Sequence, residues 1–283
     1  MTELDFEFLR GFLKTRSGLA LTPEKRYLVE SRLSPVCRRF ELGTLSGLVS
    51  ALKAGRNLAL ETAVVEAMTT NETFFFRDKG PFDLFKGILL PRYLAARAST
   101  RRLRIWCAAA STGQEPYSLA MILNEASSQL AGWRVEIVAT DISSEVLEKA
   151  KAGLYNQFEV QRGLPIQLLV KYFKQNGDHW EISPQIRAMV DYRPLNLIKD
   201  FGHLGTFDIV YCRNVLIYFD KPTKTDVLQR LANAMAPDGV LLLGAAETVI
   251  GLTEALAPDP INRGLYGKIT SETAAASKFA VSR

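Results

Sequence analysis

Histidine and cysteine are scarce in this chain of 283 residues, which has two histidines and three cysteines. With only His179 and His203 available, the sequence argues against a histidine-rich metal site and against a Ser-His-Asp triad. The cysteines, at positions 37, 107 and 212, are scattered and odd in number, which argues against a disulfide framework and favours a reducing cytosol. We therefore expect a cytoplasmic protein without a metal site.

Long apolar runs are also missing. No stretch of about 18 or more apolar residues occurs, so the sequence predicts no membrane insertion. The N-terminal stretch MTELDFEFLRGFLK carries acidic residues early and lacks a small-residue cleavage site, so it does not read as a signal peptide. Hydrophobic residues make up 47% of the chain and charged residues 23%, which is an ordinary globular composition. The length favours one large domain with a smaller one.

Positive charge is present in excess, and it is concentrated near the N-terminus. The formal net charge is +5. Between Arg10 and Arg56, ten lysines and arginines stand against three glutamates, a local excess of +7, so the remainder of the chain is slightly acidic. Such a basic segment is compatible with nucleic acid, an anionic membrane surface or an acidic protein partner.

Residues 1–66 read as a helical domain. Thr22-Pro23-Glu24 predicts a helix start with Thr22 as N-cap, and apolar residues then recur at helical spacing. Pro35 must kink this helix or split it in two.

Three basic residues of the same helix, Lys25, Arg32 and Arg39, stand seven positions apart. Unless the helix is strongly kinked, they form one basic stripe away from its apolar face. We interpret this stripe as a surface for an acidic partner. The alternative is an ordinary solvated helix face.

Residues 91–270 show a different pattern. Short apolar segments read as strands, namely LRIWCAAAS (103–111), VEIVATD (135–141), FDIVYCRN (207–214) and GVLLLGAAE (239–247). Amphipathic helical stretches lie between them, at 116–128, 144–152 and 222–236. This alternation predicts a parallel sheet covered by helices on both faces. The segment RGLYGKI near residue 265 fits a last strand.

Three further segments complete the predicted organisation. Residues 67–90 form a linker in which TTNET is followed by three phenylalanines. Residues 163–193 interrupt the alternation, and the turn signal at 176–178 predicts a small antiparallel hairpin inserted in the α/β domain, with an elaborated loop as the alternative. Residues 271–283 are small and polar, which predicts a flexible tail.

Polar residues follow the predicted strands at the edge where open parallel sheets bind ligands. The segment AAASTGQEPYS lacks both the G-x-G-x-x-G pattern and a lysine, which argues against pyrophosphate binding, and its carboxylate Glu115 suits a cation. Asp141 ends the second strand, where an acid can accept both ribose hydroxyls. Arg213, Asn214 and Tyr218 follow a later strand. S-adenosylmethionine, which combines an adenosine, a sulfonium and an amino-acid tail, matches this set better than NAD or ATP, and a dinucleotide is the alternative.

The segments MTTNETFFFR, AAASTGQEPYS, ATDIS, CRNVLIYFD and PDGVLLLG, in this order, resemble the CheR family of chemotaxis-receptor glutamate O-methyltransferases. The resemblance covers essentially the whole chain. It implies a Rossmann-like class I S-adenosylmethionine-dependent methyltransferase domain with a small antiparallel β-insertion, preceded by an all-α N-terminal domain. It also implies that glutamates on the cytoplasmic helices of methyl-accepting chemotaxis receptors are methylated, that S-adenosylhomocysteine is released, and that the basic N-terminal domain, through Lys25, Arg32 and Arg39, binds the receptor.

The resemblance further implies a set of site residues. Glu115 would hold the amino-acid end of the cofactor, and Asp141 would hold its ribose. Arg77 and Tyr218 would lie near the transferred methyl group. The implied cofactor contacts are Asn71, Thr73, Arg77, Glu115, Asp141, Asn196, Leu197, Arg213 and Asn214.

The chain departs from the family pattern at two places. Residues 244–248 read GAAET where members often have Gly-x-Ser-Glu-Asn, so the role of this loop is in doubt. Members that dock on a short peptide at the receptor's C-terminus carry a longer, glycine-flanked loop in the insertion. Here the segment FKQNGDHWEIS is short, so we expect a member that works without such a tether.

Three other functions compete with this interpretation. A methyltransferase acting on nucleic acid would suit the basic pI, but the chain has CRNVLIYF where base-amine enzymes commonly carry an Asn/Asp-Pro-Pro-aromatic loop. A cofactor-sensing module without turnover would suit the altered GAAET loop. An NAD-dependent dehydrogenase lacks the glycine fingerprint and a residue suited to hydride chemistry.

Overall fold

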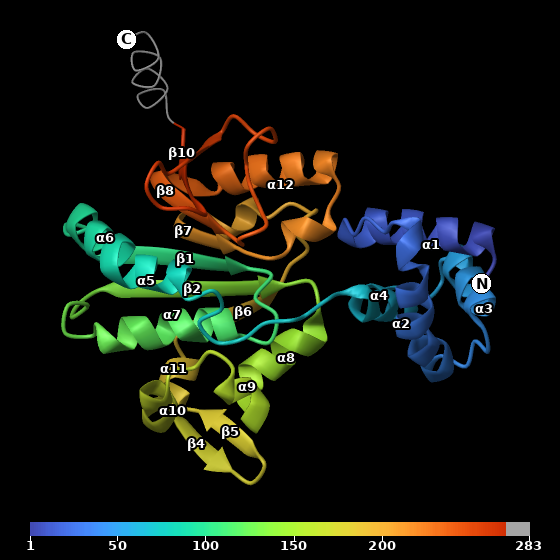
Figure 1. Ribbon diagram of the computed structural model, residues 1–283, viewed down its shortest axis with the longest axis horizontal. Helices are drawn as coiled ribbons and strands as arrows, with labels where there is room; N and C mark the ends of the chain where they lie inside the picture. Colours follow the sequence, from blue (N-terminus) through green and yellow to red (C-terminus); the bar gives the residue numbers. More distant parts are fainter. Residues whose placement is uncertain (270–283) are drawn as a thin grey trace.

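Figure 1 shows a computed structural model of the protein, in which residues 1–269 are described. A helical domain lies at one end of the molecule and faces the carboxyl edge of the central sheet (Figure 1). A small antiparallel sheet lies below the main one in this view. The flexible tail predicted for residues 271–283 lies outside the described residues.

The helical domain has its own hydrophobic core. Phe6, Leu9, Leu33 and Val64 are among its fully buried side chains. The first helix begins with a capping box in which Thr2 accepts a hydrogen bond from a backbone N–H of the first turn. The helices are α1 (Glu3–Ser17), α2 (Arg26–Arg39), α3 (Leu45–Ala54) and α4 (Leu58–Met68).

The second helix differs from its prediction in two ways. A 3₁₀ turn, Pro23–Lys25, precedes it, and the Thr22 side chain accepts no cap hydrogen bond. The helix is also continuous through Pro35, so of the two alternatives left open, a kink or a split, the split does not occur. A proline removes a single backbone hydrogen bond, and the buried side chains of Val36 and Cys37 beyond it hold the last turn against the domain core.

The α/β domain contains a seven-stranded sheet with the order β6-β2-β1-β7-β8-β10-β9. Its first five strands are parallel, whereas β10 is antiparallel to both of its neighbours. The strands are β1 (Arg102–Ala108), β2 (Arg134–Asp141), β6 (Val190–Pro194), β7 (Phe207–Cys212), β8 (Met235–Leu243), β9 (Leu256–Pro258) and β10 (Leu265–Lys268). The four predicted apolar strands and the predicted last strand are confirmed, whereas β6 and β9 were not predicted.

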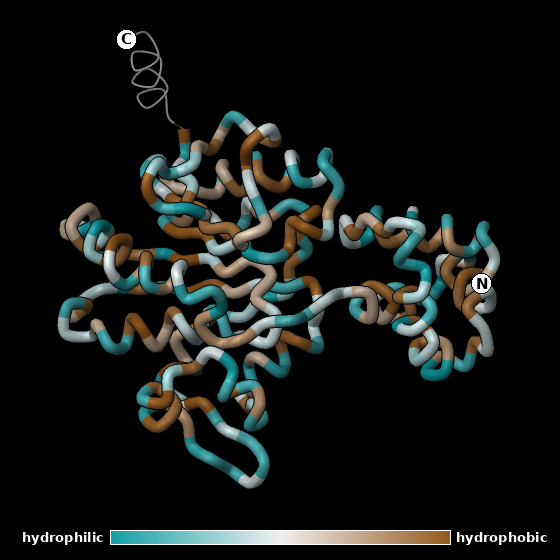
Figure 2. Tube along the Cα trace, viewed as in Figure 1, coloured by the Kyte–Doolittle hydropathy of each residue, from teal (hydrophilic) through white to brown (hydrophobic). Residues whose placement is uncertain are grey.

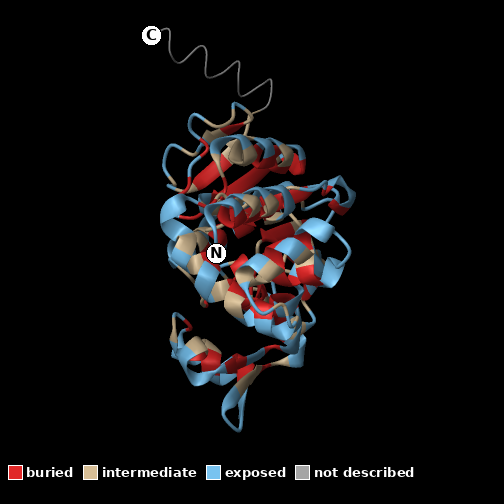
Figure 3. Cartoon of the chain, turned by 90° about the vertical axis from the view of Figure 1, so that its right-hand side faces the viewer, coloured by how far each residue is buried: buried red, intermediate tan, exposed pale blue. Residues whose placement is uncertain are grey.

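Helices cover both faces of this sheet, as predicted. Figures 2 and 3 show that its strands are mainly hydrophobic and buried. One face packs against α5 (Gly80–Leu84), a π-helical turn (Phe85–Leu89), α6 (Leu90–Ala96), α7 (Gln114–Glu125) and α8 (Ser144–Ala152). The other face packs against α12 (Lys221–Asn233) and a 3₁₀ turn (Gly202–Leu204). The helix predicted for residues 222–236 ends at Asn233 instead, because β8 already begins at Met235.

The insertion is a three-stranded antiparallel sheet with the order β3-β5-β4. The hairpin predicted around residues 176–178 is confirmed, but β3 precedes the predicted segment and β6 at its end belongs to the central sheet. The elements are β3 (Leu154–Asn156), α9 (Gln157–Gln161), α10 (Ile166–Tyr172), β4 (Phe173–Asn176), β5 (His179–Ile182) and α11 (Pro184–Arg187).

Candidate functional site

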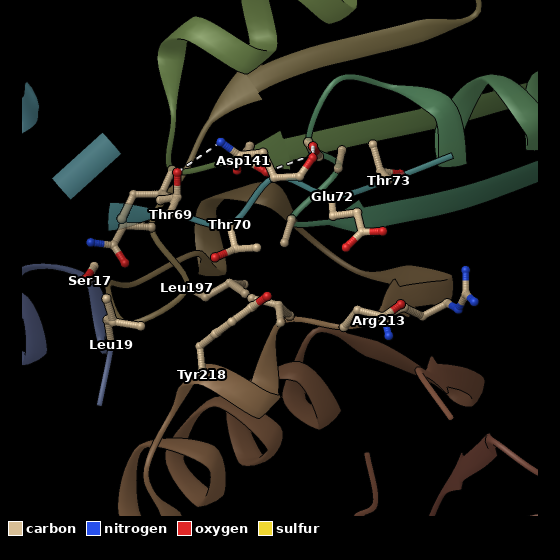
Figure 4. Close-up of a pocket in the computed structure, with 18 of the residues that line it drawn as sticks. Ser17, Leu19, Thr69, Thr70, Glu72, Thr73, Asp141, Leu197, Arg213 and Tyr218 are labelled. Carbon is tan, nitrogen blue, oxygen red and sulfur yellow. Dashed lines mark hydrogen bonds between the residues drawn. The ribbon is translucent and has the colours of Figure 1, made fainter. Parts of the chain in front are cut away.

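A cavity opens at the carboxyl edge of the central sheet, where the strand order reverses at β1. Residues 109–111 after β1, Asp141 at the end of β2, and residues 213–215 after β7 line it (Figure 4). The linker between the domains forms one wall. The helical domain closes the cavity with Ser17, Leu19, Val65 and Met68.

The Asp141 carboxylate is held by the backbone from two sides. Its Oδ2 accepts a hydrogen bond from Ser111 N at 2.8 Å, and its Oδ1 accepts one from Ser143 N at 3.0 Å. Ser111 has a φ of 50°, a left-handed conformation that aims its N–H at the carboxylate. Each carboxylate oxygen keeps a second lone pair. Burial raises the pKa of Asp141, and backbone N–H groups, among them those of Ser143 and Ser111, partly oppose that effect.

The second carboxylate of the cavity, Glu115, is paired with a buried arginine. Arg213 Nη1 lies 2.9 Å from Glu115 Oε2, and Arg213 Nη2 lies 2.7 Å from Asp78 Oδ2. The arginine side chain is 2% exposed, and its Nε has no hydrogen-bond partner within residues 1–269. Burial raises the pKa of Glu115 even though Arg213 favours its charged form. The predicted carboxylate is thus one member of a Glu-Arg-Asp arrangement, whose Asp78 was not predicted.

The linker places its polar residues by packing its aromatic ones. Phe75 is fully buried, with its ring centroid 5.0 Å from that of Tyr155 in the insertion. Asn71 Nδ2 donates to Thr69 Oγ1 at 3.0 Å, and the Asn71 carbonyl accepts a hydrogen bond from the hydroxyl of Ser111. Because one buried ring fixes this extended segment against the α/β domain, its neighbouring side chains reach the cavity.

Arg77 lies at the end of this wall. Its Nη1 donates to the Glu72 carbonyl at 2.7 Å, and its guanidinium carbon lies 5.6 Å from the centroid of the Phe74 ring. Within residues 1–269 no carboxylate lies within 4.0 Å of this guanidinium to form an ion pair. A positive charge with unused donors therefore faces the cavity, next to Thr73.

The loops after β6 and β7 join the cavity to the helical domain. Asn196 Nδ2 donates to the Arg16 carbonyl at 2.7 Å, so this predicted cofactor residue uses its amide nitrogen in a domain contact. The Tyr218 carbonyl accepts a hydrogen bond from Ala20 N at 2.9 Å, and Leu19 forms a β-bridge with Phe219. Figure 4 shows the Tyr218 side chain reaching from the loop after β7 into the cavity.

The structure brings all the predicted cofactor and catalytic residues to one cavity. They come from the linker and from the carboxyl ends of four different strands, β1, β2, β6 and β7. The residues are Asn71, Thr73, Arg77, Glu115, Asp141, Asn196, Leu197, Arg213, Asn214 and Tyr218.

Some residues of the site were missed by sequence reasoning. Asp78, which pairs with Arg213 behind the cavity lining, had a signal, because it directly follows Arg77. Ser17 and Leu19 had none, because nothing in the first 20 residues indicates contact with a loop some 200 residues later in the chain.

The predicted basic stripe on α2 is interrupted at its middle member. Arg32 is half-buried, and its guanidinium donates to the carbonyls of Met68 and Thr69 and to the Thr70 hydroxyl, each at 3.0 Å. This difference arises because α2 packs against α4, so that Arg32 reaches the end of α4 and the start of the linker. Lys25 and Arg39 are exposed.

Two classes of site are not found in the part of the chain that is described. No group of three or more His, Cys, Asp and Glu residues is arranged to hold a metal ion within residues 1–269. Over the same residues, no helix has the length and the apolar character that crossing a bilayer demands. The three cysteines are unpaired and buried.

Comparison with known proteins matches both domains. A family described as "CheR methyltransferase, all-alpha domain" matches residues 4–69, and "CheR methyltransferase, SAM binding domain" matches residues 71–263. A chemotaxis protein methyltransferase from Vibrio parahaemolyticus is 40% identical over 95% of this chain and 98% of its own length. Chemotaxis protein methyltransferase 1 of Pseudomonas aeruginosa is 43% identical over 88% and 92%. The Escherichia coli chemotaxis protein methyltransferase is 34% identical over 87% and 85%.

Proposed function

The chain belongs to the CheR methyltransferase family, and on that premise we propose that it transfers the methyl group of S-adenosylmethionine to glutamate side chains of chemotaxis receptors. The observation that supports this most is the convergence on one cavity of two buried carboxylates, Glu115 and Asp141, with the cationic Arg77. The two carboxylates suit a cationic adenosyl ligand, and the arginine suits an anionic acceptor.

The residues of the cavity fit the cofactor. Asp141 keeps one lone pair on each oxygen for the two ribose hydroxyls. Glu115 can accept from the ammonium group, and Asn71, Thr73 and residues 213–214 complete the proposed contacts. Leu197 and Asn196 border the adenine. Arg213 lines the cavity and its Nε has no hydrogen-bond partner within residues 1–269, so we propose that it donates to the carboxylate of the amino-acid end.

Bound in this cavity, the cofactor supplies a methyl group on a positively charged sulfur. The acceptor carboxylate has an unperturbed pKa near 4.3 and is already ionised at neutral pH, so the protein need not supply a general base. One carboxylate oxygen forms the new bond to carbon while the carbon–sulfur bond breaks, giving a methyl ester and S-adenosylhomocysteine. Opposite charges neutralise each other in this step, so we attribute the acceleration to proximity and alignment.

Two side chains are placed to align the acceptor. Arg77 offers donors in a planar fork that can grip a carboxylate by two parallel hydrogen bonds. Tyr218 reaches into the same cavity and offers a hydroxyl. We assign to both the orientation of the acceptor and not a proton transfer.

Incubation with labelled cofactor and candidate receptor fragments tests the proposal directly. We expect base-labile methyl esters on glutamates of the helical cytoplasmic fragments and none on nucleic acid. Product binding without any ester on any receptor fragment would favour a cofactor-sensing module. Label transferred to nucleic acid would overturn the choice of acceptor.

A basic face of the helical domain is proposed to attract the receptor. Lys25, in the 3₁₀ turn before α2, and Arg39, at the end of α2, are exposed. Receptor methylation regions are rich in glutamate, so long-range attraction would raise the rate of encounter. Reversing both to glutamate is expected to lower kcat/KM for receptor about tenfold at low salt and to leave product affinity unchanged. Arg32 is left out of this test because it binds the linker.

A matched control keeps the change in net charge the same. Lys86, in the π-helical turn, and Lys199, in the loop after β6, are exposed lysines outside the helical domain. Reversing these two to glutamate is expected to leave receptor methylation within about twofold of wild type. Equal losses in the two double variants would show that net charge, and not this face, sets the rate.

Cofactor affinity is expected to depend on pH through the two buried carboxylates. Burial raises the pKa of both Glu115 and Asp141, whereas a bound ammonium group favours the ionised form of its partner. Binding of S-adenosylhomocysteine should therefore release protons on the acidic side of neutrality, and affinity should fall as the pH is lowered from about 7.5 to about 5.5. Calorimetry in two buffers of different ionisation enthalpy measures this. A flat affinity without proton release would contradict it.

The insertion supports a receptor interaction without a C-terminal peptide tether. Only Gly177 and Asp178 lie between β4 and β5, so the hairpin has none of the longer glycine-flanked loop expected of tether-dependent members. We propose that the enzyme works in the cytoplasm on receptors that lack such a peptide. Deleting a receptor's C-terminal residues should leave its methylation rate unchanged.

A further inference from the structure

The loop after β8, residues 244–248, departs from the family pattern, and none of its residues lines the cavity. It nevertheless carries one of the few buried acidic side chains of the protein. Glu247 is 9% exposed, and within residues 1–269 it has no ion pair. A buried carboxylate without a cation needs hydrogen-bond donors, since its desolvation is otherwise unfavourable.

Four backbone N–H groups supply those donors. Oε1 of Glu247 accepts from Val215 N at 2.9 Å and from Leu216 N at 2.7 Å. Its Oε2 accepts from Asn214 N at 2.7 Å and from Gly244 N at 2.8 Å. Three consecutive N–H groups that converge on an anion form a nest, and here the anion is a side chain of the same protein.

The nest is also the segment that carries the site. Asn214 has a φ of 59°, a left-handed conformation that costs energy for a non-glycine residue and persists only where its surroundings hold it. The 3₁₀ turn Leu216–Tyr218 follows at once, and Tyr218 N donates to the Val215 carbonyl at 3.1 Å. A shift of Glu247 would therefore move both Asn214 and Tyr218, which line the cavity.

Gly244 shows how closely the two loops approach each other. A Cβ at this position would lie 2.7 Å from Nδ2 of Asn214 and 2.8 Å from Oε2 of Glu247. Any larger residue would push the carboxylate and the amide apart. The departures from the family pattern, at Ala246 and Thr248, leave both the glycine and the glutamate in place.

We propose that Glu247 is a positioning residue for cofactor binding and methyl transfer, acting through the backbone of residues 214–216. This inference rests on the proposed function only for its effect on turnover, since its effect on product affinity is measured without a receptor. Glutamine in its place keeps the size but turns an NH₂ group toward two of the four N–H donors. Charge-assisted hydrogen bonds are the strong ones, so the turn loses its fixed conformation.

Two double-mutant cycles distinguish a positioning role of Glu247 from a role in the stability of the fold alone. Glu247→Gln is expected to weaken S-adenosylhomocysteine binding about tenfold and to lower kcat about tenfold. If it acts through the turn, combining it with Asn214→Ala for product affinity, or with Tyr218→Phe for kcat, should cost less than the sum of the single effects. A purely structural role predicts additive effects and a kcat per folded molecule equal to that of wild type.

Controls keep every outcome decisive. Glu254→Gln removes the same charge from an exposed site in the same region and should behave as wild type. If Glu247→Gln does not fold, Gly244→Ala disturbs the same contact from the other side and enters the same cycles. If wild-type protein binds product but methylates no receptor, the proposed function fails. The cycle for product affinity then still tests whether Glu247 positions the cofactor site. Additive effects, or a Glu247→Gln variant equal to Glu254→Gln, would overturn the inference.

Discussion

Replacing Arg77 with alanine is expected to lower methyl transfer to receptor about 100-fold or more and to leave the protein folded. The guanidinium faces the cavity, is steadied by the Glu72 carbonyl and the Phe74 ring, and has no carboxylate partner within residues 1–269. Its charge is thus available to align an incoming carboxylate, and misalignment by about 1 Å can cost about 100-fold. Initial rates at saturating cofactor and receptor, with circular dichroism as a check of folding, measure the effect.

A neighbouring arginine provides a matched control. Arg162 lies 4.3 Å from the centroid of the same Phe74 ring, but its guanidinium pairs with the Glu72 carboxylate at 2.7 Å and does not line the cavity. Arg162→Ala should keep most of the activity. Arg77→Lys, which retains the charge but not the planar fork, should fall between wild type and Arg77→Ala. Near-normal transfer by Arg77→Ala would remove Arg77 from the mechanism.

The second large effect is expected at Asp141, where asparagine should weaken S-adenosylhomocysteine binding about 100-fold. Both carboxylate oxygens already accept backbone N–H groups, from Ser111 and Ser143, and each has one lone pair left for a ribose hydroxyl. An amide replaces one of these acceptors with a donor that opposes a backbone N–H. Losing two charge-assisted hydrogen bonds of about 1.5 kcal/mol each corresponds to about 100-fold in affinity.

Isothermal calorimetry with the purified variants tests this expectation. Asp191→Asn removes an exposed carboxylate from the edge strand β6, where Asp191 pairs with Arg193, and should leave affinity unchanged. Thermal unfolding of both variants separates a loss of contact from a loss of fold. An Asp141→Asn protein that binds product within threefold of wild type would exclude the ribose assignment.

The parts of the structure that follow from local pattern were predictable. Apolar segments flanked by polar residues became β1, β2, β7 and β8, and parallel pairing then fixes their carboxyl ends at one edge. Glu115 and Asp141 meet there for that reason. Strand β6 was missed because it is an edge strand in which exposed Asp191 and Arg193 alternate with buried residues, directly after an inserted sheet.

Partners distant in the chain were not predictable. The pairing of Arg213 with Glu115 and Asp78 joins residues 98 and 135 positions apart, and the contact of Asn196 with Arg16 joins residues 180 apart. Arg32 resembled one more cation of a solvated stripe until the packing of α2 on α4 placed it against the linker. The role of Glu247 was not predictable for the same reason, because three of its four N–H donors belong to residues 214–216, which lie 31 to 33 positions earlier in the chain.

The docking of the α1–α2 loop on the segment after β7 bears on the engineering of receptor choice. Gly18 has a φ of 78°, and a Cβ there would lie 2.7 Å from Ile198 and 3.0 Å from Phe219. Chimeras that exchange the helical domain between relatives would therefore have to carry residues 17–20 and their counterparts at 196–198 and 218–219 as one matched set. A hybrid joined only at the linker would have mismatched side chains at this contact between the domains, next to the cavity.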